Sequence, residues 1–180
     1  IGFNEFFLKL LLVVIPSATL IFFIYMLGKE MYNEKTGIIA AAASTFMWSY
    51  LFWGDRFQPD FLSLNFQILS LIFFWRLFKK DDSKIAIYAG LFAALGFYFK
   101  ISALIVPMII PLFVLWKDGL DMFKKKSYWI SVASFVLTLV PFMIWQFVMF
   151  GNPIAFAPSY SDPIGKAQAG WGLGLQALDY

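Results

Sequence analysis

Four charged residues stand out in an otherwise apolar sequence. Asp55, Arg56 and Asp60 share one short polar stretch, and Lys100 interrupts the long apolar stretch of residues 85–116. Lysine binds phosphate as a point charge, and arginine binds it through a planar fork of donors. Phosphate is also a good leaving group once its charge is stabilised. These residues therefore predict a site for an anionic lipid headgroup, in which a nearby carboxylate orients a bound cation or a sugar hydroxyl.

The residue types that are missing narrow the chemistry. The chain has no cysteine and no histidine, which excludes disulfides, thiolate or imidazole metal ligands, and Cys or His catalysis within it. Any acid–base or metal chemistry must use carboxylates. The net charge is +3, but the basic residues lie in short clusters between apolar blocks. That pattern sets membrane topology and does not form a nucleic-acid groove, so we expect no nucleic-acid partner.

The elements that must position these residues are membrane helices. Hydrophobic residues make up 61% of the chain and charged residues only 14%, whereas a soluble domain has about 25% charged residues. Such an apolar excess must face lipid. The sequence predicts an all-α, polytopic transmembrane helix bundle over residues 1–150, followed by a truncated outer-face loop at 151–180. About six crossings of about 20 residues each are expected, near residues 6–28, 37–53, 61–78, 85–99, 101–116 and 127–150.

The stretch of residues 85–116 is too long for one crossing. A straight helix over it would be about 48 Å long at about 1.5 Å per residue, against a hydrocarbon core of about 30 Å. The loops on either side, 79–84 and 117–126, are both rich in lysine, so the chain must cross an even number of times between them. We therefore predict two arms that meet at Lys100.

The basic residues divide unequally between the two sides of this topology. Of the fourteen, Lys9, Arg56, Lys100 and Lys166 fall on one side with Asp55 and Asp60. The other side, which the positive-inside rule makes cytoplasmic, holds Lys29, Lys35, Arg76, Lys79, Lys80, Lys84, Lys117, Lys124, Lys125 and Lys126. The predicted phosphate site is then extracytoplasmic.

The depth of this site leaves alternatives open. Two arms of about 15 residues reach only about 23 Å each, which would leave Lys100 below the outer surface, where ionisable groups usually line a cavity or meet a charged partner. Lys100 could instead snorkel to the headgroups. Asp55 and Arg56 could be an ordinary interfacial loop pair, and Asp60, which follows Pro59, could be only a helix N-cap.

Other polar and aromatic residues fit the same bundle. Asn65 and Gln67 lie inside the third span and are expected to face other helices. Pro16 is tolerable in the first span because Ser17 and neighbouring helices can satisfy the freed backbone groups. Most tryptophans are interpreted as an interfacial belt.

Four segments of the chain resemble a known family. They are Tyr25–Glu30 (YMLGKE), Gly37–Ala41 (GIIAA), Arg56-x-x-x-Asp60 and Gly90–Lys100 (GLFAALGFYFK). Together they are similar to the membrane-embedded GT-C glycosyltransferases, in the branch of the protein O-mannosyltransferases and the aminoarabinose transferases acting on lipid A. The similarity runs from about residue 10 to about residue 150.

This resemblance implies an enzyme that takes a sugar from a polyprenyl-phosphate carrier. It would pass the sugar to a glycan, lipid or protein acceptor on the extracytoplasmic face of the cell membrane, which we expect to be prokaryotic. Lys100 would contact the carrier phosphate with Arg56 near it. Asp60 and Asp55 would organise the donor site, with a divalent cation at Asp60 as one version of that role. The first span would be the family's second helix, in the orientation that the charge count gives independently.

The catalytic residue is unknown from the sequence. The family's main catalytic carboxylate lies in an outer loop before its second helix, and Glu5 is a poor substitute so close to the first span. We expect the chain, from Ile1 to Tyr180, to be an internal fragment that lacks this loop. Two alternatives remain: a transporter or lipid-handling module with Lys100 and Asp60 at a broken helix, or a non-catalytic subunit with the same fold.

Overall fold

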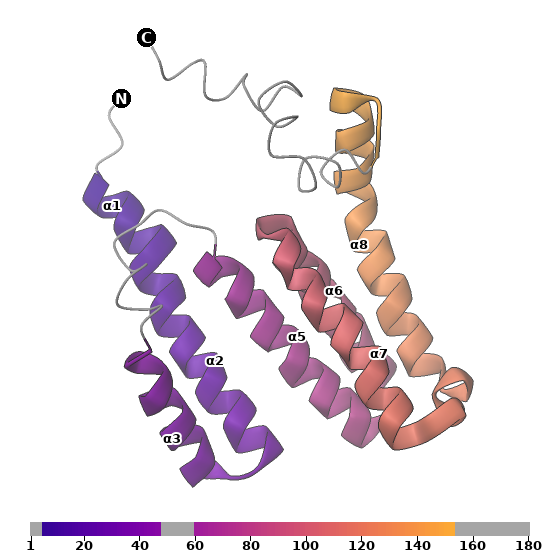
Figure 1. The fold of residues 1–180 in the computed structure, drawn as a ribbon, viewed down its shortest axis with the longest axis horizontal. Helices are drawn as coiled ribbons and strands as arrows, with labels where there is room; N and C mark the ends of the chain where they lie inside the picture. Colours follow the sequence, from indigo (N-terminus) through magenta and orange to yellow (C-terminus); the bar gives the residue numbers. More distant parts are fainter. Residues whose placement is uncertain (1–4, 48–59, 154–180) are drawn as a thin grey trace. The chain divides into compact units, whose positions relative to one another are not determined.

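A computed structural model describes residues 5–47 and 60–153, and the secondary structure in these ranges is entirely helical (Figure 1). The α-helices are α1 (Glu5–Lys9), α2 (Ile15–Met31), α3 (Glu34–Thr45), α5 (Asp60–Lys80), α6 (Ser83–Phe99), α7 (Ile105–Asp118) and α8 (Lys126–Phe150). A π-helix, η1 (Leu10–Val14), joins α1 to α2, and two 3₁₀ helices, η2 (Ile101–Leu104) and η3 (Gly119–Lys124), flank α7. The predicted all-α class is confirmed.

Four of the described helical segments are long and apolar enough to cross a membrane: Phe7–Met31, Asp60–Lys80, Ile101–Asp121 and Lys126–Phe150. Ser83–Phe99 is apolar but shorter. The predicted span 37–53 is described only as far as Met47, and α3 within it ends at Thr45. A transmembrane bundle is therefore supported, while the count of about six crossings stays a prediction.

The chain divides into two compact units, residues 1–138 and 139–180, and the divide falls within α8. In the first unit α5 packs against both α2 and α6, and α3 packs against the other side of α2 (Figure 1). The predicted outer-face loop, from residue 154 onward, lies outside the described residues.

Small residues allow the helices to pack closely. A Cβ atom on Gly37 would lie 2.6 Å from the Tyr25 carbonyl oxygen, and one on Gly28 would lie 2.9 Å from the Gly37 Cα, so only glycine fits where α2 meets α3. Ala42 and Ala43, further along α3, are exposed, so the glycine pair and not the alanine run makes this contact.

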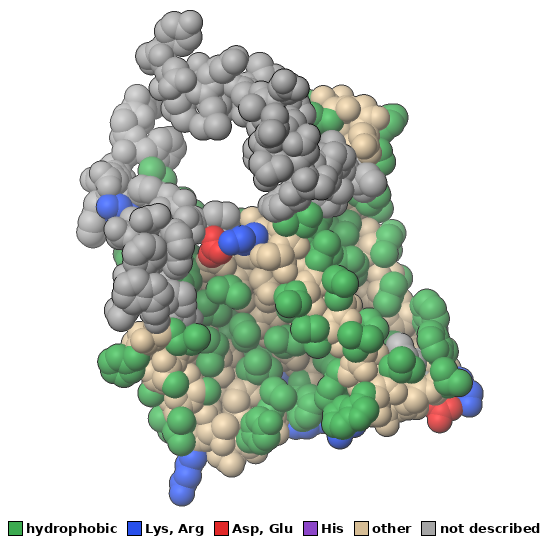
Figure 2. Space-filling model, viewed as in Figure 1, with side chains coloured by type: hydrophobic (Ala, Val, Ile, Leu, Met, Phe, Trp, Pro, Cys, Tyr) green, Lys and Arg blue, Asp and Glu red, His purple; other side chains and the backbone are tan. Residues whose placement is uncertain are grey.

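Hydrophobic side chains occupy both the interior and the surface of the first unit. Ile72, Leu77 and Ala86 are almost fully buried, whereas Met108, Leu112 and Trp116 on α7 are each more than 60% exposed. Figure 2 shows hydrophobic side chains spread over most of the visible described surface. An apolar exterior of this extent is typical of a protein whose solvent is lipid.

Polar side chains join α5 to α2 inside this apolar setting. The Asn65 amide donates to the Pro16 carbonyl at 2.7 Å, and the Thr19 hydroxyl donates to the Asn65 Oδ1 at 3.0 Å. The Ser17 hydroxyl donates to the Val13 carbonyl at 2.6 Å, one turn before the proline. Asn65 therefore faces another helix as predicted, and the proline is accommodated by a π-turn and neighbouring donors.

The predicted interruption at Lys100 is present. Helix α6 ends at Phe99, and Lys100 has extended backbone dihedrals (φ −157°, ψ 128°) before the chain turns into η2 and α7. The Lys100 N–H still donates to the Gly96 carbonyl at 3.2 Å, and the Lys100 carbonyl accepts from Ala103 at 3.0 Å. Residues 85–116 therefore form two arms.

Candidate donor-phosphate site

The centre of the candidate site is an ion pair between Lys100 and Asp60. Asp60 is the first residue of α5, and Lys100 directly follows α6. Because α5 and α6 run antiparallel, the beginning of one and the end of the other lie together, and the Lys100 ammonium donates to the Asp60 carboxylate. Their side chains are 42% and 31% exposed. The pair is thus accessible to a ligand and is also held by protein.

The position of Asp60 suits a carboxylate. The first turn of an α-helix has unpaired N–H groups and the positive end of the helix dipole, which stabilise a negative charge there. Asp60 therefore stays a good anionic partner for Lys100 in a mainly apolar setting. Its further role as an N-cap remains an open alternative.

Two neutral residues reach the same place from α5. The Ser63 hydroxyl donates to the Gly96 carbonyl at 2.9 Å, and the Gln67 amide donates to the Ser63 hydroxyl at 3.1 Å. Gln67 was predicted to face another helix, but neither residue was predicted to belong to the site. The signal was present in the spacing, because positions 60, 63 and 67 lie on one face of a helix.

Two of the predicted site residues, Asp55 and Arg56, lie outside the described residues, so their roles stay predictions. Within the described ranges, no group of three or more side chains of the types that bind metals is present. Among the residues that the structure describes, Asp60 supplies the carboxylate beside Lys100, and that carboxylate already accepts from the ammonium. Mg²⁺ usually takes one or two protein carboxylates together with substrate phosphates. A divalent cation at Asp60 therefore also stays a prediction.

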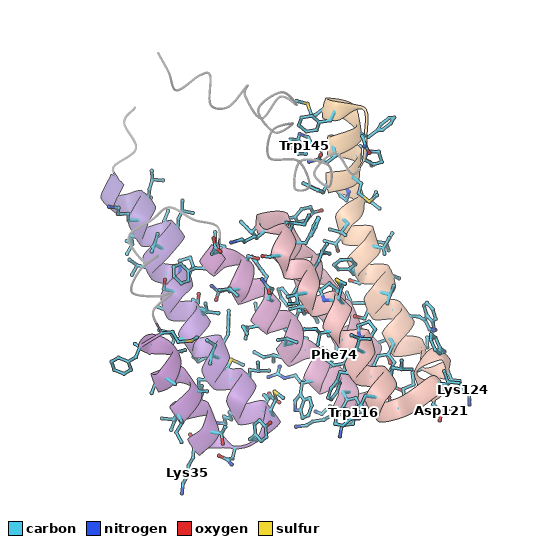
Figure 3. The ribbon with its side chains drawn as sticks, viewed as in Figure 1. Lys35, Phe74, Trp116, Asp121, Lys124 and Trp145 are labelled. Carbon is cyan, nitrogen blue, oxygen red and sulfur yellow. The ribbon has the colours of Figure 1, made fainter. Side chains whose placement is uncertain are left out.

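The other end of the first unit gathers basic and acidic residues. Arg76 Nε donates to the Glu30 carboxylate at 2.9 Å, and the Glu30 carbonyl accepts from Trp75 at 3.0 Å and from Lys79 at 2.8 Å. Figure 3 shows Lys35, Trp116, Asp121 and Lys124 at this end, far along the helices from the start of α5. The lysine-rich segments thus share one end, as their predicted grouping requires, and the ion pair of Lys100 lies at the other.

Comparison with protein families adds an independent finding. The model for the dolichyl-phosphate-mannose-protein mannosyltransferase family matches residues 1–145. The chain belongs to this family. Neither a search of characterised proteins nor a search of solved structures gave a match.

Membership of the mannosyltransferase family confirms the resemblance to GT-C glycosyltransferases. This mannosyltransferase-family chain is accordingly a membrane glycosyltransferase of the GT-C type, with several membrane-spanning helices. The matched region includes Asp60, Lys100 and the residues that join α5 to α6. The family therefore favours an enzyme over the transporter that a charged broken helix alone could also indicate.

Proposed function

We propose that this protein transfers a sugar from a polyprenyl-phosphate carrier to an acceptor on the extracytoplasmic face, and that Lys100 contacts the carrier phosphate. The observation that carries the proposal is the ion pair of Lys100 with Asp60, at a chain reversal at the end of the first unit away from the lysine-rich segments. A lysine held at a helix end inside a lipid-embedded protein is costly unless it serves a ligand or partner.

The geometry of the pair suits phosphate binding. A lysine ammonium has three donor hydrogens, so one bond to Asp60 leaves others for a phosphate oxygen. Because both side chains are partly exposed, the pair contributes little net stability and can be rearranged by an incoming anion. Asp60 then limits where the ammonium can lie, and the phosphate supplies the remaining acceptors.

The proposed reaction is a displacement at the anomeric carbon of the carrier-linked sugar. The acceptor hydroxyl oxygen forms the new bond to that carbon as the bond between the carbon and the phosphate oxygen breaks. The electron pair of the broken bond leaves with the phosphate. The hydroxyl proton passes to a carboxylate base, which we do not assign to a residue. Lys100, with Arg56 as a further expected partner, stabilises the charge on the departing phosphate. A single donor aimed at developing charge typically contributes about 3 kcal/mol.

The proposed side of the reaction follows from charge. If the lysine-rich end is cytoplasmic, as the positive-inside rule requires, then the opposite end that contains Lys100 faces outward. Reagent accessibility of single cysteines tests this directly, because residues 1–180 contain none. A cysteine at Lys84 should react only from the cytoplasmic side, and labelling from outside would reverse the assignment.

A pair of matched variants tests the phosphate contact. We expect Lys100→Ala in the full-length protein to reduce transfer from a polyprenyl-phosphate sugar at least about 100-fold, the usual scale for loss of one stabilising cation. Lys125→Ala is the control, because Lys125 forms a comparable ion pair with Asp118, at 2.6 Å, at the lysine-rich end. Transfer should be compared at equal protein level in the membrane. Normal transfer by Lys100→Ala would refute the proposed donor site.

A further inference from the structure

Ser63 and Gln67 are polar residues buried in the part of α5 that follows Asp60. Ser63 is 1% exposed and Gln67 is 9% exposed, and both lie within an apolar candidate membrane span. Burying a hydroxyl or an amide away from water costs free energy unless it forms hydrogen bonds. Their partners therefore indicate what this pair of residues does.

Their hydrogen bonds lead to the backbone of Lys100. Gln67 donates to Ser63 Oγ, and Ser63 Oγ donates to the Gly96 carbonyl at 2.9 Å. The same carbonyl accepts the backbone N–H of Lys100 at 3.2 Å, which is feasible because a carbonyl oxygen has two lone pairs. Helix α5 thus contacts Lys100 in two ways. Asp60 binds its ammonium, and Ser63 binds the Gly96 carbonyl, which also accepts the backbone N–H of Lys100.

This arrangement matters because α6 ends there. The Gly96 carbonyl accepts the last backbone N–H bond of α6, that of the C-cap Lys100, and helix ends fray unless neighbouring groups hold them. The α5 and α6 backbones are also close, since a Cβ atom on Gly96 would lie 3.4 Å from the Ser63 carbonyl oxygen. Ser63 is consequently well placed to fix the helix end from which the Lys100 side chain projects.

We propose that Ser63 and Gln67 are positioning residues, which hold the end of α6 so that the Lys100 ammonium stays beside Asp60. Neither residue contacts the ligand in this proposal. Its consequence for donor binding rests on the proposed function, in which Lys100 binds the carrier phosphate. Small displacements of a binding group lower its effectiveness, so loss of Ser63 should weaken donor binding without removing the cation.

Ser70 provides a matched control. Its hydroxyl donates to the Ala89 carbonyl at 2.9 Å, and the residue is 0% exposed. Ser63 and Ser70 therefore make the same kind of buried bond between the same two helices, but Ser70 does so nearer the lysine-rich end. Ser63→Ala and Ser70→Ala should lower stability to a similar extent, and only Ser63→Ala should affect Lys100.

Two measurements on the full-length protein distinguish positioning from a purely structural role. The first is the rate of reductive methylation of Lys100 relative to Lys124, which is 81% exposed, measured by mass spectrometry. The second is the KM for a polyprenyl-phosphate sugar, measured separately from kcat. For Ser63→Ala we expect Lys100 to react faster and KM to rise about fivefold, the scale of one lost hydrogen bond. Gln67→Met should give a smaller change in the same direction, and Ser70→Ala neither change.

The outcomes separate this proposal from the proposed function. If Ser63→Ala matches Ser70→Ala in both measurements, the positioning role is wrong. If Lys100→Ala transfers sugar normally while Ser63→Ala still raises the methylation of Lys100, positioning stands and the donor role fails. If Ser63→Ala does not accumulate in the membrane, Gln67→Met decides: unchanged methylation of Lys100 in that variant would overturn the proposal.

Discussion

The two ends of the first unit use similar ions in different settings. At the start of α5, the ion pair of Lys100 with Asp60 is partly exposed and is supported by one neutral hydrogen bond, from Ser63 to the Gly96 carbonyl. At the lysine-rich end, three residues donate to Glu30: Arg76 to its carboxylate, and Trp75 and Lys79 to its backbone carbonyl.

Aromatic rings extend this difference. The Lys117 ammonium lies 4.4 Å from the centre of the Trp116 ring, and the Lys79 ammonium lies 5.2 Å from that of Trp75. Cations that are bound to rings, carbonyls and carboxylates together are typical of a membrane-interface anchor. A single cation with one carboxylate, held in place through its backbone, is better suited to accept a second anion. The groups that hold a lysine in place, more than its charge, therefore separate anchoring from ligand binding.

Among the substitutions that keep Lys100, removing the carboxylate of its partner Asp60 should lower sugar transfer the most. We expect Asp60→Asn to lower sugar transfer about tenfold, because the ammonium loses the partner that limits its position, a cost of about 1.4 kcal/mol. Transfer in membranes with equal protein content measures this. Asp118→Asn removes the partner of Lys125 and should leave transfer per folded molecule almost unchanged. Equal losses in the two variants would show that the two ends do not differ in function.

Removing the arginine at the other end should affect stability more than activity. Arg76→Ala leaves the Glu30 carboxylate without its guanidinium partner, and both side chains are about one-third exposed. Solvent screening therefore limits the expected loss to about 1 kcal/mol of unfolding free energy. Thermal denaturation in detergent measures that loss, and kcat for the remaining folded protein should stay near the natural value. A large fall in kcat would place Arg76 in the reaction and not in the anchor.

The smallest effect is expected for an exposed pair of the lysine-rich end. Lys124 and Asp121 lie 2.6 Å apart, three residues apart on η3, with side chains 81% and 69% exposed (Figure 3). Lys124→Ala should change the unfolding free energy by less than about 0.5 kcal/mol and leave transfer unchanged, by the same denaturation and transfer assays. A clear loss of either would mean that this surface pair has a partner that the described residues do not include.

Much of the helical architecture could be predicted because it depends on quantities that a sequence carries. The length of residues 85–116 exceeds the thickness of a bilayer, and lysines flank it on both sides, so a turn near Lys100 was required. The resemblance to GT-C enzymes could likewise be read from segments of sequence, and the family match agrees with it. The number of membrane crossings was harder to predict from the sequence, because α3 and α6 are shorter than a typical membrane span.

The candidate site could be predicted only in part. Asp60 and Lys100 were both identified as site residues, but their direct contact depends on the antiparallel packing of α5 and α6. Ser63 was missed because a serine in an apolar helix usually bonds its own helix, and nothing local shows that its acceptor is Gly96. The same holds for the glycine contact between α2 and α3, because nothing local shows that Gly28 and Gly37 meet.

Hydropathy and length in the sequence established that this protein lies in a membrane and that the chain turns near Lys100, and its charge distribution predicts that most of the lysines lie on one side. Those properties follow from hydropathy, charge and length, which act over single segments. The spacing of Asp60, Ser63 and Gln67 puts them on one helix face, but that this face is directed at the end of α6 depends on the tertiary structure. The physical reason is that a hydrogen bond or ion pair depends on the register between two helices, and packing of side chains from both of them sets that register.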